Sequence, residues 1–180
     1  MNSRDLKVHL IVGRRNVGKS HLINEFIDQI GANRCIVFDP NSEHSKSCSV
    51  DKFETVDEFM AEIYEIGVRE KKWKEQPVYI FVEESTAYFR SKKDKSPRDE
   101  AMISRNRHLG IEFYFIFHSL RSIPLWILEY ADNIFLFKTT DKKNAFYQAW
   151  KKYPKVVEAF EKYDKMTLKQ SKGKFTHIIL

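Results

Sequence analysis

The chain has 180 residues, of which 42% are hydrophobic and 31% are charged. This length suits one α/β domain with a hydrophobic core and is too short for two domains of ordinary size, so we expect residues 1–180 to form a single domain. With only six Gly and five Pro residues, the composition excludes collagen-like and low-complexity chains. The formal net charge of +6 permits a polyanionic partner but does not identify one.

The sequence contains no segment that we expect to enter a membrane or a secretion pathway. No run approaches the about 18 apolar residues of a membrane-spanning helix, and the first residues lack the pattern of a secretory signal. Cys35 and Cys48 form no CxxC pair and have no His at zinc spacing. We therefore expect an intracellular protein with two reduced cysteines and neither a disulfide nor a cysteine metal site.

The first half of the chain alternates predicted strands and helices. Residues 6–12 form a short apolar run that ends at a glycine, and apolar residues then recur at helical spacing over residues 22–30. This pattern predicts a strand, a loop and a helix. Residues 34–39 are a second β-rich run, and helical spacing returns over residues 56–63, so another strand and helix follow.

The second half continues this alternation. Residues 78–82 and 111–117 are almost uniformly apolar, as parallel strands buried on both faces are. A polar, basic stretch lies between them, followed by a helix that begins near Pro97. Residues 133–137 predict a fifth strand, and residues 174–180 are a last β-like run. The alternation predicts a parallel sheet with helices on both faces and ligands at the carboxyl ends of the strands.

A phosphate-binding motif, G-x-x-x-x-G-K-S, follows the first predicted strand and opens the first predicted helix. It comprises Gly13, Arg14, Arg15, Asn16, Val17, Gly18, Lys19 and Ser20. The glycines let the backbone curl so that successive N–H groups point inward, where they and the helix N-terminus bind phosphate. We assign these residues and the following His21 to nucleotide binding, with Lys19 on the β- and γ-phosphates and Ser20 on Mg²⁺. Arg14 and Arg15 either add charge near the phosphates or form a solvated surface pair.

Two adjacent carboxylates, Glu83 and Glu84, directly follow the buried strand at residues 78–82. Adjacent side chains at the end of a strand point to opposite sides of the pleat, so the two carboxylates can take different roles. We assign Glu83 to the Mg²⁺ shell, together with Ser20, and Glu84 to the water that attacks the γ-phosphate. The alternative is that one or both only solvate the end of the strand.

Three stretches of the sequence resemble the additional-strand P-loop ATPases, and within them the FtsK/HerA group of DNA-pumping motors. They are GRRNVGKS, VYIFVEES, and RHLGI leading into EFYFIFHS. The resemblance implies a three-layer α/β, RecA/FtsK-like P-loop fold with a mainly parallel central sheet. Glu83 stands where this group commonly has Asp, and His118 stands where it commonly has Gln. A neutral His118 can still hydrogen-bond to a γ-phosphate or to water, although a core position is the alternative.

The resemblance also implies an arginine that acts on the nucleotide of a neighbouring subunit. Arg107 corresponds to this arginine finger, which stabilises charge in the transition state. Arg105 competes for the role, and either residue can instead be a plain surface arginine. We therefore take the predicted catalytic residues to be Lys19, Glu84, Arg107 and His118.

Within the group, the length of this chain favours the short, single-domain members. These members resemble the genome-packaging ATPases of icosahedral viruses that contain an internal membrane. This resemblance implies an ATP-hydrolysing translocase that packages viral double-stranded DNA into a preformed capsid. It further implies ATP and Mg²⁺ as cofactors, a ring of identical subunits, capsid vertex or portal-like components as partners, and a location in the host cytoplasm or with the virion. The basic residues at 90–98 are predicted to bind DNA, and the alternative is a charged surface loop. A second basic cluster, at residues 69–74, is explained by the favourable interaction of cations with a helix C-terminus.

Two other functions remain open from the sequence. One is a Zot-like or other P-loop assembly ATPase, or a nucleotide switch with little turnover. The other is a small P-loop kinase, against which the sequence shows no arginine-rich lid after the fourth predicted strand. Assays of ATP hydrolysis with and without DNA, and of phosphate transfer to nucleosides, separate these functions from a motor.

Overall fold

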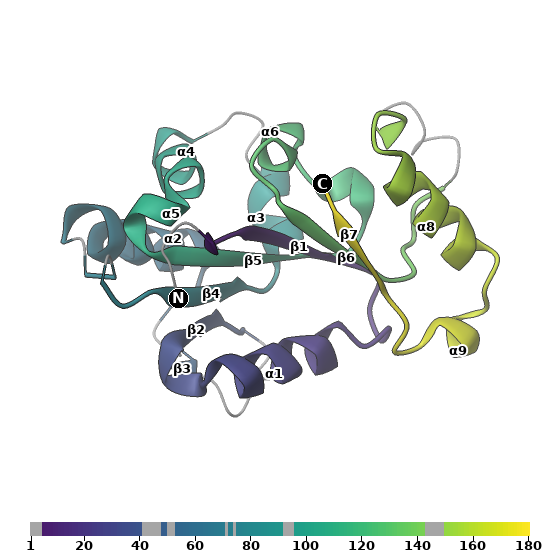
Figure 1. The fold of residues 1–180 in the computed structure, drawn as a ribbon, viewed down its shortest axis with the longest axis horizontal. Coiled ribbons are helices and arrows are strands. Elements are labelled where there is room, and N and C mark those ends of the chain that lie inside the picture. Colours follow the sequence, from purple (N-terminus) through teal and green to yellow (C-terminus); the bar gives the residue numbers. More distant parts are fainter. Residues whose placement is uncertain are drawn as a thin grey trace.

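The fold is built around a central β-sheet. The computed structural model of the chain describes residues 5–40, 48–49, 53–70, 72–73, 75–91, 96–142 and 150–180. Within these residues, seven strands pair in the order β3-β2-β4-β5-β1-β6-β7 (Figure 1). All neighbours are parallel except β6 and β7, which are antiparallel. The strands are β1 (Val8–Val12), β2 (Cys35–Phe38), β3 (Cys48–Ser49), β4 (Val78–Val82), β5 (Ile111–Phe117), β6 (Asn133–Leu136) and β7 (Thr176–Ile179).

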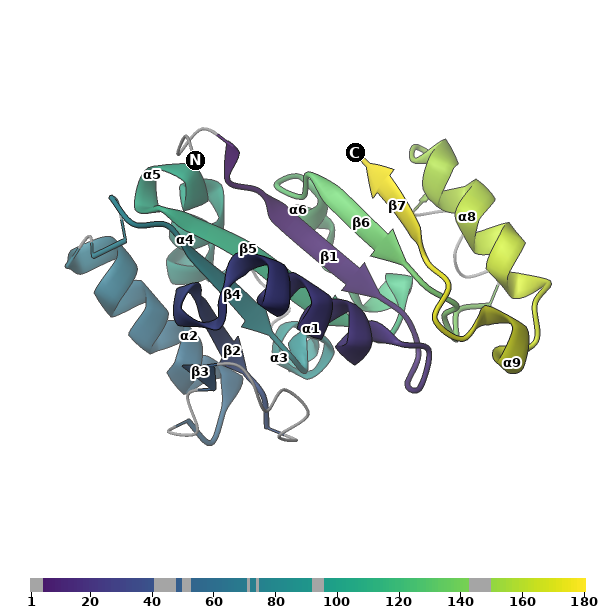
Figure 2. The ribbon, with the colours of Figure 1, turned by 60° about the horizontal axis from the view of Figure 1, so that its bottom comes forward.

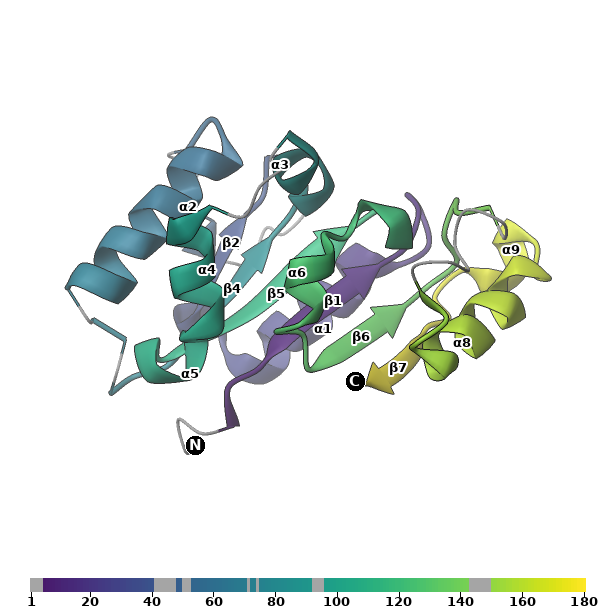
Figure 3. The same cartoon turned by 90° about the horizontal axis from the view of Figure 1, so that it is seen from above.

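Helices cover both faces of the sheet and complete the three predicted layers. Among the described residues, α1 packs on one face (Figure 2), and α2, α3, α4, α6 and α8 pack on the other (Figure 3). The helices are α1 (Lys19–Ile30), α2 (Val56–Tyr64), α3 (Ser85–Ser91), α4 (Pro97–Ser104), α5 (Asn106–Leu109), α6 (Leu125–Leu128), α8 (Pro154–Asp164) and α9 (Leu168–Ser171). A π-helical turn, Glu65–Arg69, continues α2, and 3₁₀ turns occupy Ala32–Arg34 and Leu120–Ser122.

The topology confirms the predicted additional-strand fold. Strand β5 lies between β1, which leads into the phosphate loop, and β4, which leads into the acidic pair. The bounds of β4 and β5 are those predicted from their apolar runs, and the other predicted strands are one to three residues shorter. Strand β3 and helix α3 were not predicted. The last β-like run of the chain extends the sheet as β7, and its antiparallel direction ends the parallel pattern at that edge.

The core on both faces is rich in aromatic rings, which explains much of the aromatic content of the chain. In β5, Phe113, Phe115 and Phe117 pack on the face of the larger helical layer, while Tyr114 packs beneath α1. A fully buried Phe contributes about 1.5–3 kcal/mol to stability, so this strand anchors both layers. The predicted packing role of Trp150 is confirmed because only 2% of its surface is exposed.

Some residues singled out from the sequence lie partly or wholly outside the described residues. They are residues 92–95 of the predicted DNA-binding segment, Lys71 and Lys74 of the second basic cluster, and Phe146. The side chain of Cys48 is likewise outside the description, whereas Cys35 is buried. In the part of the chain that the structure describes, no helix combines the length and apolar character needed to cross a bilayer.

Candidate nucleotide-binding site

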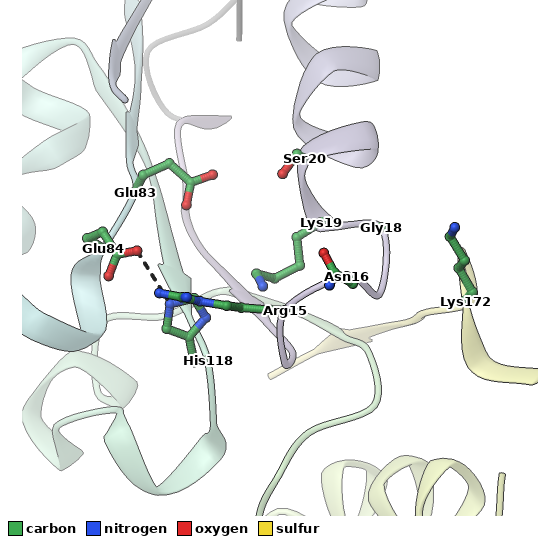
Figure 4. A pocket seen from close by; sticks show the side chains of 9 residues that line it. All are labelled: Arg15, Asn16, Gly18, Lys19, Ser20, Glu83, Glu84, His118 and Lys172. Carbon is green, nitrogen blue, oxygen red and sulfur yellow. Dashed lines mark ion pairs between the residues drawn. The ribbon is translucent and has the colours of Figure 1, made fainter. Parts of the chain in front are cut away.

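A cavity of about 510 Å³ opens at the carboxyl ends of the parallel strands β1, β4 and β5 (Figure 4). This is the edge at which ligands bind in open α/β sheets. The cavity is lined by Arg15, Asn16, Gly18, Lys19, Ser20, Glu83, Glu84, His118 and Lys172. Three separate parts of the predicted site, the phosphate loop, the acidic pair and His118, therefore meet at one place.

The phosphate loop is curled and tied to the ends of neighbouring strands. Asn16 and Gly18 have positive φ angles of 63° and 108°, which let the chain turn back toward α1. The Gly13 N–H donates to the Phe117 carbonyl at 3.0 Å. A Cβ on Gly13 would lie 2.6 Å from Cβ of Phe137, so only glycine fits there. These angles and contacts constrain the conformation of the loop.

Lys19 is held inside this curl. Only 8% of its surface is exposed, and its Nζ donates to the carbonyls of Gly13 at 2.8 Å and Arg14 at 3.0 Å. Both acceptors belong to the phosphate loop, so the ammonium group is positioned beside the surface that would receive phosphate oxygens. The hydroxyl of Ser20 lies on the same side of the cavity, in the first turn of α1 (Figure 4).

The acidic pair lies differently from the prediction. Glu83 and Glu84 were expected on opposite sides of the pleat, but both line the one cavity. The reason is that the strand ends at Val82 and the chain turns at Glu84, whose φ is +55°. Such a φ is uncommon for a residue with a side chain, and strained residues of this kind cluster at functional sites. Here it brings the second carboxylate to the same cavity as the first.

Two hydroxyl groups stabilise this turn. The buried Ser85 hydroxyl donates to the Val82 carbonyl at 2.7 Å and accepts from the Ile116 N–H at 3.3 Å. Thr86 Oγ1 accepts from the His118 N–H at 2.9 Å. The residues that follow the acidic pair thus bind the end of β5 and set the distance between Glu84 and His118.

His118 is the polar residue at the end of β5. Its Nε2 lies 3.6 Å from Oε1 of Glu84 (Figure 4), and within the described residues neither buried ring nitrogen has a hydrogen-bond partner. Buried polar atoms normally have partners, and an exception points to a ligand or to a functional role. The imidazole is therefore placed to bind a group that enters the cavity.

Of the other residues assigned to nucleotide binding, Arg15 lines the cavity, whereas Arg14, Val17 and His21 do not. The Arg15 side chain points toward the end that holds Glu84 and His118 (Figure 4). Val17 is fully buried in the core beneath α1. The His21 side chain is 79% exposed and lies 3.3 Å from Glu25, so only the backbone of His21 faces the predicted phosphate site at the start of α1.

Arg107 lies at the opposite end of the strands, in α5 before β5 begins. Its Nε donates to the Leu6 carbonyl at 3.0 Å, and a terminal nitrogen is 2.9 Å from Asp132. Arg105, the competing residue, is exposed at the junction of α4 and α5. Neither arginine lines the cavity of its own chain. Any contact between Arg107 and a nucleotide would have to be with that of another subunit.

The residues fit Mg²⁺ bound together with a nucleotide. Among the described residues, no three His, Cys, Asp or Glu side chains gather as a metal cage, so protein groups alone do not complete a metal shell. Mg²⁺ is commonly held by one or two protein oxygens while phosphates and water supply the other ligands. Ser20 and Glu83 line the same cavity and offer such oxygens.

One lining residue, Lys172, was not predicted from the sequence. It follows α9 near the end of the chain and belongs to no motif. No spacing or composition signal connects it with the phosphate loop, because only the path of α8, α9 and β7 brings the two together.

Comparisons of the structure reveal clear relatives of the fold. The genome-packaging NTPase B204 of Sulfolobus turreted icosahedral virus 2, in complex with sulfate, superposes with a TM-score of 0.75 at 20% identity, covering 97% of this chain and 91% of that one. B204 of Sulfolobus turreted icosahedral virus, a DNA-packaging ATPase, gives 0.72 at 23% identity over 93% and 90%. The chain has the fold of these packaging NTPases.

A more distant structure shares the fold of this chain over nearly its whole length. The conjugation coupling protein TcpA of pCW3, with ATPγS, gives a TM-score of 0.63 at 12% identity, covering 99% of this chain and 59% of that one. No protein-family model and no curated protein matches the sequence. The similarity to known proteins is therefore one of fold.

Proposed function

We propose that the protein is an ATP-hydrolysing motor that moves viral double-stranded DNA into a preformed capsid. The observation that carries the ATPase part is the convergence of Lys19, Glu84 and His118 on one cavity beside Ser20 and Glu83. The packaging part is supported by the fold shared with the B204 NTPases and by the net charge of +6.

The chemistry would be in-line attack of water on the γ-phosphate. The loop N–H groups and Lys19 hold the β- and γ-phosphates, while Ser20 and Glu83 hold Mg²⁺, which neutralises phosphate charge when bound. Glu84 orients the water and accepts its proton as the new O–P bond forms and the bond to the β–γ bridging oxygen breaks. His118 donates a hydrogen bond to a γ-phosphate oxygen, so its contribution is lost when the phosphate leaves.

Assembly would complete the site. Arg107 lies outside its own cavity, so we assign it to the nucleotide of a neighbouring identical subunit in a ring. A lone subunit then lacks the group that stabilises transition-state charge and hydrolyses ATP slowly. The ring also gives the basic residues a channel in which to grip DNA without reading its sequence.

The remaining parts of the proposal concern context. Residues 1–180 act as one domain, with the basic stretch at residues 90–98 contacting DNA. The motor works in the host cytoplasm or on the virion and docks on vertex or portal-like components of the capsid. These assignments follow from the resemblance to packaging ATPases and from the shared fold.

Steady-state ATP hydrolysis against protein concentration, with and without duplex DNA, tests the proposal. The protein is compared with Lys19→Ala, Glu84→Gln and Arg107→Ala, and with Lys174→Ala as a control outside the cavity. We expect activity to rise cooperatively with concentration and DNA, the three site variants to lose it, Glu84→Gln to keep ATP binding, and the control to match the parent. If the rate of ATP hydrolysis does not depend on protein concentration or DNA and Arg107→Ala remains active, the motor function is wrong. Transfer of phosphate to nucleosides would instead indicate a kinase.

A further inference from the structure

Lys172 brings a cation into the nucleotide cavity from the C-terminal segment of the chain. It lines the cavity together with the phosphate loop, yet it lies more than 150 residues later in the sequence. In the described part of the chain its ammonium group has no ion-pair or hydrogen-bond partner. The side chain can therefore meet a ligand without first breaking a contact.

The backbone beside Lys172 is fixed to the phosphate loop. The Gly173 N–H donates to the Val17 carbonyl at 2.8 Å. A Cβ on Gly18 would lie 3.2 Å from Cα of Gly173, so the two backbones are in close approach where the loop turns into α1. The backbone of Lys172 is therefore held at a defined place beside the loop, while its side chain is exposed.

The residues on either side add to this anchoring. Ser171 is fully buried, and its hydroxyl donates to the Leu168 carbonyl at 3.0 Å. The Lys174 N–H donates to the Ser171 carbonyl at 3.1 Å. Phe175 packs on Phe137, with ring centroids 5.2 Å apart. These contacts fix the conformation of the turn from α9 to β7 and pack it on the end of β6.

The position of Lys172 within the cavity indicates which part of a nucleotide it would meet. Glu84 and His118 mark the γ-phosphate end, and Lys19 points toward that end (Figure 4). Lys172 lies on the other side of Gly18 and Asn16 (Figure 4). A triphosphate with its γ-phosphate beside Glu84 runs away from that end, so its α-phosphate would lie toward Lys172.

We propose that Lys172 is a binding residue for the α-phosphate of a nucleoside phosphate, supplied by the C-terminal segment rather than by the phosphate loop. The proposal rests on nucleotide binding in the proposed function, but not on hydrolysis, DNA or ring assembly. A charge-assisted hydrogen bond to phosphate is among the strong ones. Because the α-phosphate is common to AMP, ADP and ATP, Lys172 would raise the affinity for all three.

Calorimetric titration of AMP, ADP and ATP in the presence of Mg²⁺ tests this assignment. Lys172→Ala is compared with the parent, with Lys172→Arg, which keeps the charge, and with Lys174→Ala, an exposed lysine in the same turn that does not line the cavity. We expect Lys172→Ala to weaken binding of all three nucleotides about tenfold. Lys172→Arg and Lys174→Ala should bind as the parent does.

Each other outcome has a distinct meaning. Parent-like binding by Lys172→Ala, with binding lost in Lys19→Ala, overturns the Lys172 assignment and leaves the proposed function standing. Weakening for ATP but not for AMP places the contact at another phosphate and also overturns it. Equal weakening by Lys172→Ala and Lys174→Ala shows a general charge effect and likewise overturns the assignment. Failure of the parent protein to bind any nucleotide removes both proposals.

Discussion

His118 Nε2 and Glu84 Oε1 face each other across a gap of 3.6 Å at the end of the cavity. This distance is too long for a hydrogen bond but suits a pair that shares a third group. Each side chain is 28% exposed, but both ring nitrogens of His118 are buried. In the proposed mechanism, this proximity places Glu84, assigned to the attacking water, and His118, assigned to the γ-phosphate, at the same reacting centre.

The first prediction concerns the imidazole itself. His118→Ala should lower the rate of ATP hydrolysis about 10²-fold, the effect of removing one preorganised donor to a transition state. His118→Gln should restore much of the activity, because an amide can donate the same hydrogen bond. The measurement is steady-state hydrolysis at saturating ATP. His108→Ala, at an exposed position on α5, is the matched control, and a parent-like rate for His118→Ala would exclude a catalytic part for this side chain.

The second prediction tests whether Arg107 has a catalytic role or only a structural one. Its guanidinium forms an ion pair with Asp132 at 2.9 Å, and the other carboxylate oxygen of Asp132 accepts from the Val8 N–H at 2.9 Å. Asp132→Asn breaks the ion pair but keeps an acceptor for Val8. If Arg107 acts on a neighbouring nucleotide, Arg107→Ala loses about 10³-fold or more of the DNA-stimulated rate, while Asp132→Asn stays within a few-fold of the parent. Equal losses in the two variants would mean that the ion pair, not a finger, is what matters.

Much of the sheet could be predicted because β1, β4, β5 and β6 are buried on both faces. The apolar runs of β4 and β5 have no polar interruption except Glu112, so their bounds follow from composition alone. Helix α1 was equally clear because the phosphate loop fixes its first residue. By contrast, β3 is only two residues long and α3 begins directly after the acidic turn and has only seven residues, so neither carries a periodic signal.

The parts of the site that depend on residue type and spacing could be predicted from the sequence. The parts that depend on the path of the backbone could not. Spacing identifies the phosphate loop, but alternation along a strand put Glu83 and Glu84 on opposite sides because it assumes that the strand continues. The positive φ of Glu84 breaks that assumption. Lys172 could not be predicted, because it reaches the cavity only as a result of the long-range packing of Gly173 on Val17 and Gly18.

The third prediction uses two glycines that share a positive φ but not their surroundings. Gly18 has φ +108° and would meet Gly173 at 3.2 Å, whereas Gly173 has φ +72° and nothing within 4 Å of an added Cβ. Gly18→Ala should therefore distort the loop and abolish nucleotide binding. Gly173→Ala should cost about 1–2 kcal/mol of stability from backbone strain alone and keep binding. Titration with ATP, alongside urea denaturation, checks both, and intact binding by Gly18→Ala would show that the close approach is dispensable.

The fourth prediction concerns the buried polar cluster beneath α1. Glu112 interrupts β5 and lies 2.9 Å from His9 Nε2, and the Tyr114 hydroxyl donates to the same carboxylate oxygen at 2.8 Å. Burial, and then the nearby Glu112, raise the pKa of Tyr114 well above its usual value, so the hydroxyl remains a donor. Tyr114→Phe should destabilise the protein by about 1–3 kcal/mol, because the buried Glu112 oxygen loses one of its two partners and keeps only His9.

Urea denaturation at neutral pH measures this loss. Tyr153→Phe is the control, since the Tyr153 hydroxyl has no hydrogen-bond partner among the described residues. We expect the control to stay within about 0.5 kcal/mol of the parent, as substitutions away from such features do. A Tyr114→Phe variant as stable as the control would mean that the carboxylate is satisfied without the hydroxyl.

The fifth prediction is a dependence of stability on pH at His177. Its Nε2 lies 2.8 Å from Oδ1 of Asn133, and its ring stacks on Phe135 with centroids 4.6 Å apart. Burial, followed by electrostatic interaction with His9 and Lys7, lowers the pKa of His177 below the ordinary histidine value of 6.5. As pH falls through about 6.5, the unfolded chain takes up a proton that the folded protein resists, so stability decreases. Thermal melts of the parent and of His177→Gln between neutral and mildly acidic pH should diverge, with the steeper loss in the parent, and parallel curves would assign the pH dependence to other groups.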